Sequence, residues 1–228
     1  MTFGKAAATL AAALTLAACG PKVPDYQAIW STKSSAPAPA DTSGLIPFPT
    51  YLEKIKVGTE QVVPSSLTDL KVNLPRPQGW TEYKNLNYSP GTVTIADHDS
   101  YPMAMLMVFR MSGDFDVDEA IKHADADALL SQNFKKLDGS TDKFQGFPSS
   151  MIEGSYDLNG KRLHTYNRVV IPVTPAPRFQ RYLVQFTVTT LADQAARAKA
   201  SIVLRGFANG SLRTTVAQVQ RLIGDRQV

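Results

Sequence analysis

The stretch IEGSYDLNGKRLHTYN, residues 152–167, predicts the element around which we expect the fold to be built. At its centre, Asn159-Gly160 is the strongest short-range signal for a two-residue β-turn, because a type I′ turn needs two residues that tolerate positive φ. Pairing about this turn sets five pairs of residues opposite one another: Tyr156 and Leu163, Gly154 and Thr165, Ile152 and Asn167, Asp157 and Arg162, and Glu153 and Tyr166. The first three pairs share one face, so the stretch predicts an antiparallel hairpin with one drier face.

Further strands are predicted on both sides of this hairpin. Apolar residues alternate over 70–74, and residues 91–97 place Val93 and Ile95 on one face. Residues 103–111 form a nine-residue apolar run between turn signals, which favours a buried strand. Residues 169–173 extend the second hairpin strand, and residues 182–190 predict another.

Helical spacing of apolar residues predicts three helices. A short one covers residues 51–57, and a long one starts at the N-cap Asp116, with Glu119 at capping-box spacing, and ends near Gly139. A last helix is predicted from about residue 192 to residue 208, with Thr190 as its cap. Short antiparallel strands and flanking helices predict an α+β domain with a mainly antiparallel sheet.

The N-terminus has the pattern of a lipoprotein signal peptide. Lys5 gives a positive start, and the apolar run over residues 6–16 is far shorter than the about 20 residues of a membrane-spanning helix. Leu16-Ala17-Ala18-Cys19 then matches a lipobox, and Cys19 is the one cysteine of the chain, so no disulfide within the chain can use it. We expect residues 1–18 to be cleaved and Cys19 to carry the lipid that anchors the protein.

Composition divides the rest of the chain. Residues 19–49 are rich in proline, alanine and serine, which predicts an extended spacer after the lipidated cysteine. Residues 50–228 are expected to form one globular domain on the extracytoplasmic face of the cell membrane. The alternative is a secreted protein without a lipid anchor, but this leaves the single unpaired cysteine without a role.

Several short motifs, taken in order, resemble the mycobacterial LpqN/LpqT-type lipoproteins. They are Val72-Asn73-Leu74-Pro75-Arg76-Pro77-Gln78-Gly79-Trp80, Ser112-Gly113-Asp114, Gly146-Phe147, Gly154-Ser155-Tyr156, Asn159-Gly160-Lys161 and Val169-Val170-Ile171-Pro172. The resemblance covers roughly residues 71–208. It implies a Mog1/PsbP-like α/β/α sandwich and an actinobacterial cell envelope, and it supplies no catalytic residues.

No catalytic, metal or cofactor motif stands out. Three histidines, His98, His123 and His164, are predicted on a loop, a helix and a strand and share no motif. Asp114, Asp116 and Asp118 have calcium-loop spacing, but positions six and twelve of such a loop hold Glu119 and Asp125, so helix capping explains these acids better. We expect no catalytic site, no metal and no cofactor, and a glycine-rich phosphate loop is absent from the sequence.

The last quarter of the chain is basic. From Arg181 onward there are seven positive residues and two acidic ones, and a stripe of Arg197 and Arg205 on the last helix is a candidate contact with an anionic surface. The alternative is a solubilising helix face. Nucleic acid is an implausible partner for an exported protein.

Three functions remain open from the sequence. The first is a non-enzymatic envelope protein that binds a lipid or glycolipid or supports a membrane transport complex through a membrane protein partner. The second is a hydrolase of envelope components whose residues assemble only in three dimensions. The third is a surface protein that contacts a host or protein partner. An apolar pocket on the sheet favours the first function, and a histidine bonded to a carboxylate in a cleft favours the second.

Overall fold

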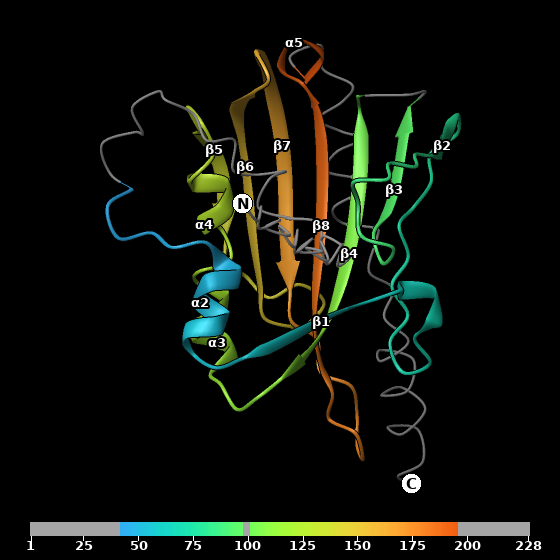
Figure 1. Ribbon diagram of the computed structural model, residues 1–228, viewed down its shortest axis with the longest axis vertical. Helices are drawn as coiled ribbons and strands as arrows, with labels where there is room; N and C mark the ends of the chain where they lie inside the picture. The colour runs from blue at the N-terminus through green and yellow to red at the C-terminus, as the bar shows by residue number, and fades with distance from the viewer. Residues whose placement is uncertain (1–41, 98–100, 196–228) are drawn as a thin grey trace, which may run out of the picture.

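A computed structural model describes residues 42–97 and 101–195, and its main feature is an eight-stranded antiparallel sheet (Figure 1). The strand order is β2-β3-β4-β8-β7-β6-β5, and β1 pairs with the C-terminal half of β4. The strands are β1 Gly58–Val62, β2 Trp80–Glu82, β3 Val93–Asp97, β4 Met103–Ser112, β5 Lys135–Ser140, β6 Ser149–Leu158, β7 Lys161–Val170 and β8 Arg181–Leu191. The predicted α+β fold with a mainly antiparallel sheet is confirmed.

The hairpin β6–β7 has the predicted register. All five predicted pairs are ladder partners. Asn159 and Gly160 have φ values of 50° and 73°, as the two central positions of a type I′ turn require. The turn chemistry and the alternation of side chains therefore agree, and β7 lies inside the sheet between β6 and β8.

One face of the sheet, the helix face, is covered by short helices. Figure 1 shows α2 Phe48–Lys54, α3 Val117–Ile121 and α4 Ala126–Leu129 gathered at the β5 end. Phe48 and Leu52 of α2 pack with Ala120 and Ile121 of α3. The sheet contributes Met111, Val169 and Leu183 to the same cluster. Residues two apart on a strand share a face, so the alternate residues of β4, β7 and β8 bury this layer.

The opposite face, the loop face, is covered in part by residues 63–79, which include the 3-10 helix η1 Pro64–Ser66. Leu70 and Val72 pack against Leu106, Val108 and other strand residues. The predicted strand at 70–74 is wrong, because these residues make no ladder pairing. Their alternation reflects burial on the sheet instead: Leu70 and Val72 are buried while Lys71 is exposed.

The long helix predicted after Asp116 is also wrong beyond its first turns. Asp116 does cap α3, since its carboxylate accepts a hydrogen bond from the backbone N–H of Glu119 at 3.0 Å. The chain then turns at residues 122–125 before α4, and Asp125 accepts a hydrogen bond from the Ser150 hydroxyl on β6. The segment expected to end the helix is the edge strand β5, which pairs with β6. Tertiary contact with the sheet therefore overrides the helical spacing.

The structure tests the predicted start of the domain fully and the predicted last helix only in part. Helix α2 begins at Phe48, two residues before the predicted start of the domain, and Phe48 is buried in the core. The predicted last helix is described only as α5 Ala192–Ala195, and its remainder lies outside the described residues. Among the described helices, none is long and apolar enough to cross a bilayer.

Candidate functional site

A cavity of about 380 Å³ lies on the loop face, between residues 64–76 and strands β3 and β4. We call it the loop-face cavity. Its apolar lining comes from the covering segment and from the sheet: Pro64, Leu67, Leu70, Val72, Leu74, Val93, Ile95 and Leu106. The covering segment forms no strand pairing with the sheet, and its side chains together with those of β3 and β4 line this space. Such a cavity suits an apolar chain or ring.

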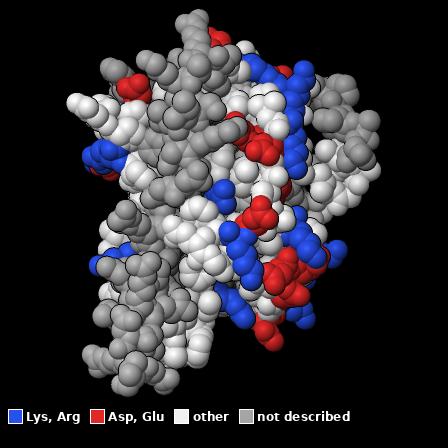
Figure 2. Space-filling model, turned by 180° about the vertical axis from the view of Figure 1, so that it is seen from behind, with Lys and Arg blue, Asp and Glu red and all other residues white. Residues whose placement is uncertain are grey.

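The rim of the loop-face cavity is polar and basic. Lys71, Asn73 and Arg76 alternate with the buried residues of the covering segment and are exposed. Among the lining residues two are positively charged and none is acidic. On the face seen in Figure 2, acidic and basic side chains of the described residues are interspersed. The positive rim is therefore a local feature, suited to a polar or anionic group attached to the apolar part of a ligand.

A second, polar pocket of about 290 Å³ adjoins the loop-face cavity through Leu67, which lines both. Its side chains include Arg110, Arg178 and Gln180. The Tyr182 hydroxyl donates a hydrogen bond to Asp69 at 3.0 Å, and burial together with this carboxylate raises the pKa of Tyr182. Hydroxyl, amide and guanidinium groups thus border an apolar space, an arrangement that fits an amphipathic ligand.

The structure brings His164 and Glu153 together on β7 and β6. The His164 Nε2 and Glu153 Oε1 atoms are 2.9 Å apart, and both residues are buried on the loop face. Ser155 lies opposite His164 in the ladder, but its hydroxyl accepts a hydrogen bond from Arg162 at 2.7 Å. His164 lines neither the loop-face cavity nor the polar pocket. The serine opposite His164 is therefore held by Arg162, and the pair does not border either of these two pockets.

The other two histidines are placed differently. His123 stacks on Tyr51, with ring centroids 3.8 Å apart, and its Nε2 lies 3.7 Å from Glu119. The stacking contact joins the turn after α3 to α2, and the His123 side chain is partly exposed. His98 lies outside the described residues. The structure thus gives His123 a packing contact with Tyr51 and a carboxylate neighbour in Glu119.

Asp127 fastens α2 to α4. Pro47 precedes α2 and gives no side-chain cap, and the Asp127 carboxylate instead accepts a hydrogen bond from the backbone N–H of Phe48. Burial raises the pKa of Asp127 to about 6, against an ordinary value of 3.8. Desolvation outweighs the hydrogen bond to the charged form, so the ionised carboxylate is a cost to the folded state at neutral pH.

Asp127→Asn is expected to raise the free energy of unfolding at pH 7.5 by about 1–2 kcal/mol. The amide keeps an oxygen for the Phe48 N–H and never ionises. In the parent the folded-state pKa exceeds the unfolded value, so its stability should rise as the pH falls from about 6 to about 4. Urea unfolding at several pH values should show this slope and its loss in the variant. Asp116→Asn is the matched control, because asparagine caps as well as aspartate. Lower stability of Asp127→Asn at pH 7.5 would contradict the assignment.

The site residues predicted from the sequence lie outside the described residues. These are the lipobox Leu16-Ala17-Ala18, the lipidated Cys19 and the basic stripe of Arg197 and Arg205. They stay predictions. The residues that line the two pockets were not predicted as a site, although the alternation at 70–74 signalled their burial.

Comparison with known proteins gives the family. The model of the family described as "Probable lipoprotein LpqN" matches residues 45–204. The chain belongs to the LpqN lipoprotein family. Within this family it is 53% identical over 205 residues to the lipoprotein named LpqT of Mycobacterium tuberculosis, covering 89% of this chain and 90% of the relative. It is 48% identical over 204 residues to the Mycobacterium leprae LpqT, covering 89% and 93%.

A solved structure of the LpqN family supports the fold. It is the crystal structure of LpqN, described as involved in cell envelope biogenesis of Mycobacterium tuberculosis. It superposes with a TM-score of 0.58 at 19% identity and covers 73% of this chain and 94% of that chain. The predicted resemblance to LpqN/LpqT-type lipoproteins is confirmed.

Proposed function

We propose that this chain is a lipid-anchored protein on the extracytoplasmic face of the cell membrane that binds an envelope lipid or glycolipid without transforming it. The observation that carries the proposal is the loop-face cavity, which combines an apolar lining with an exposed basic rim. The adjoining polar pocket supplies hydrogen-bonding groups within reach of a head group. Membership of a lipoprotein family supports the anchor, and the involvement of LpqN in cell envelope biogenesis supports the ligand class.

The hydrolase alternative has one supporting observation, the buried pair of His164 and Glu153. The pair is buried on the neighbouring strands β6 and β7, and the serine opposite His164 in the ladder is held by Arg162. Binding therefore explains the geometry of the described residues better than hydrolysis. A role beside a membrane protein partner fits the same proposal, since a carrier of an insoluble molecule needs a donor or an acceptor.

Native mass spectrometry of the acyl-free protein with extracted envelope lipids tests this function. We expect a bound lipid that is retained by the parent and lost in Leu67→Trp, because the larger ring fills the space shared by the two pockets. Lys71→Glu with Arg76→Glu should weaken the binding of anionic lipids, and Lys161→Glu, on the hairpin turn, should not.

Two results would contradict the proposal. One is the absence of any bound lipid in the parent protein. The other is a lipid that both Leu67→Trp and the rim variant retain unchanged while their folding is intact by circular dichroism. Release of a cleaved lipid product by the parent, but not by His164→Gln, would favour the hydrolase instead.

A further inference from the structure

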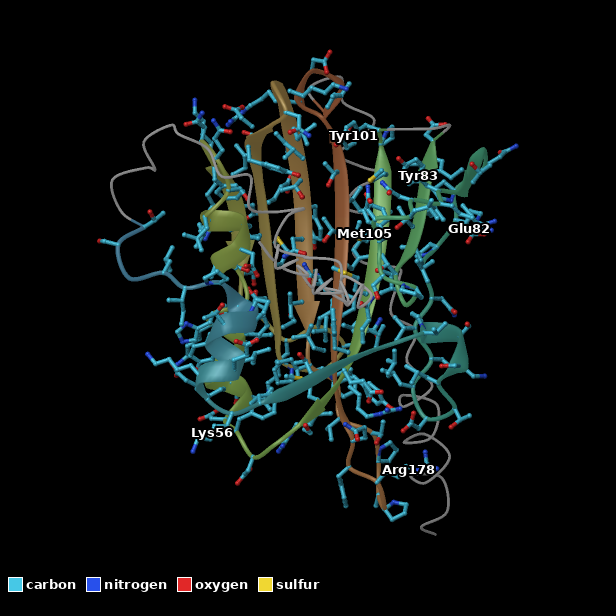
Figure 3. All side chains as sticks on the ribbon, in the orientation of Figure 1. Lys56, Glu82, Tyr83, Tyr101, Met105 and Arg178 are labelled. Carbon is cyan, nitrogen blue, oxygen red and sulfur yellow. The ribbon has the colours of Figure 1, made fainter. Side chains whose placement is uncertain are left out.

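The connection between β7 and β8 projects from one end of the molecule (Figure 1). Residues 175–179 at its tip are all exposed. Phe179 is 66% exposed, and the Arg178 side chain is 67% exposed. Figure 3 places Arg178 and Lys56 at this lower end, far from Tyr101 at the upper end. The tip therefore joins a large exposed aromatic ring to a positive charge on the outermost loop of the described structure.

Hydrogen bonds hold this tip firmly at its base. The backbone N–H of Thr174 donates to the carbonyl of Gln180 at 2.8 Å, and the Gln180 N–H donates to the Thr174 hydroxyl at 2.9 Å. The Gln180 side chain donates to the carbonyl of Met111 on β4, also at 2.8 Å. Thr174 is buried. Phe179 is thus presented by a fastened loop, which lowers the entropic cost of using the ring for contact.

The backbone at Phe179 gives a second indication. Its φ is +48°, a conformation that is uncommon for bulky residues and that glycine or asparagine adopts more readily. Burial of the ring does little to offset the cost of this backbone conformation, since two thirds of the residue is exposed. Residues held in such conformations concentrate at functional sites. A phenyl side chain at this position is therefore better explained by a contact outside the domain.

We propose that residues 175–179 form a membrane-contacting tip. Phe179 enters the boundary between headgroups and acyl chains of an anionic bilayer, and Arg178 contacts the lipid phosphates. Aromatic rings favour this boundary, and a nearby arginine adds attraction to anionic lipids. Arg178 Nη1 lies 3.6 Å from Asp69 Oδ2, and because its side chain is still 67% exposed, the guanidinium can contact phosphate from the solvent side. This inference does not depend on the occupant of the loop-face cavity.

The placement of the tip has a consequence for the pockets. Arg178 lines the polar pocket, which adjoins the loop-face cavity through Leu67. Docking of the tip therefore brings both pockets close to the bilayer. A lipid anchor raises the effective concentration of the domain at that bilayer, so a weak tip contact suffices to orient it.

Vesicle binding of the mature chain carrying Cys19→Ser, which removes the acylation site, tests the tip. The probes are vesicles of phosphatidylglycerol with phosphatidylcholine and vesicles of phosphatidylcholine alone, in a flotation assay. We expect the parent to prefer anionic vesicles at low ionic strength. Phe179→Gly should weaken this binding about tenfold. Arg178→Glu should weaken it about fivefold or more, and the difference should shrink as salt rises.

Matched controls distinguish an effect of the tip from a general effect of removing an exposed apolar side chain or reversing a charge. Leu137 on β5 is 63% exposed, a fraction close to that of Phe179, but it lies outside the tip. Leu137→Ser should therefore bind like the parent. Lys161→Glu changes the same charge as Arg178→Glu at the opposite end of β7 and should have little effect. Phe179→Gly relieves the positive φ, so its melting temperature should be unchanged or higher.

A single-site probe reports contact directly. Because Cys19 is the one cysteine of the sequence, Phe179→Cys in the Cys19→Ser chain takes one environment-sensitive dye, and Leu137→Cys gives the control. Dye emission at position 179 should shift to the blue on anionic vesicles, and at position 137 it should not. The proposal is overturned if the parent ignores anionic vesicles at low salt, or if both tip variants bind like the parent. A fall in melting temperature for Phe179→Gly also overturns it.

Discussion

His164→Ala is expected to lower the free energy of unfolding by about 3–5 kcal/mol. His164 and Glu153 form a buried pair in which the two side chains are 11% and 9% exposed. Removal of the imidazole leaves the carboxylate without its partner in a place that water reaches poorly, and the lost hydrogen bond is the smaller part of the cost. Urea unfolding followed by circular dichroism measures the effect.

His123→Ala is the matched control, because it makes the same substitution at an exposed site. The His123 side chain is 37% exposed, and its partner Glu119 is 50% exposed, so the cost should be about 1 kcal/mol, mostly from lost stacking on Tyr51. Replacement of both Glu153 and His164 by apolar residues of similar size should cost less than His164→Ala alone. Equal destabilisation by His164→Ala and His123→Ala would contradict the role of burial.

Cys19→Ala is expected to remove the protein from the membrane fraction, or to leave the precursor unprocessed. The cysteine sulfur is the predicted site of the diacylglyceryl group, and two or more acyl chains give stable anchoring where one chain gives only marginal binding. Fractionation of cells and labelling with radioactive palmitate measure anchoring and acylation separately. The expected change is nearly complete, since no other cysteine can accept the lipid.

Phe179→Gly in the chain that keeps Cys19 is the control for this prediction. It removes the proposed tip contact but keeps the anchor, so the protein should stay in the membrane fraction and stay labelled. A Cys19→Ala protein that is processed, unlabelled and still membrane-bound would show that the anchor is not the main attachment.

Strands β3, β4, β6, β7 and β8 were predictable because their signals are local. The Asn159-Gly160 turn needs two positive φ values, and it fixes the register of β6 and β7 without help from distant residues. The apolar run that became β4 is buried on both faces, and its length between turn signals pointed to a strand. In these segments local preference and tertiary packing agree.

The predictions that were wrong concern segments in which the local side-chain pattern and the tertiary packing favour different structures. Leu70 and Val72 alternate like strand residues, but their backbone finds no partner strand and only their side chains dock on the sheet. The predicted helix ran on from Phe134 to near Gly139, yet residues 135–140 pair with the edge of β6. Strand pairing satisfies the hydrogen bonds of backbone N–H and C=O groups, and the pattern of apolar side chains carries no information about these bonds.

The sequence by itself determined the β6–β7 register, the cap at Asp116 and, through the order of its motifs, the LpqN lipoprotein family. It also carries the prediction of the anchor at Cys19, because a lipobox is read as a linear peptide. Only the tertiary structure decided the sites. Leu67 and Leu106 line one cavity although they are 39 positions apart, and Phe179 is exposed although its residue type predicts burial. A cavity and an outermost loop depend on how separate segments pack, which no local pattern records.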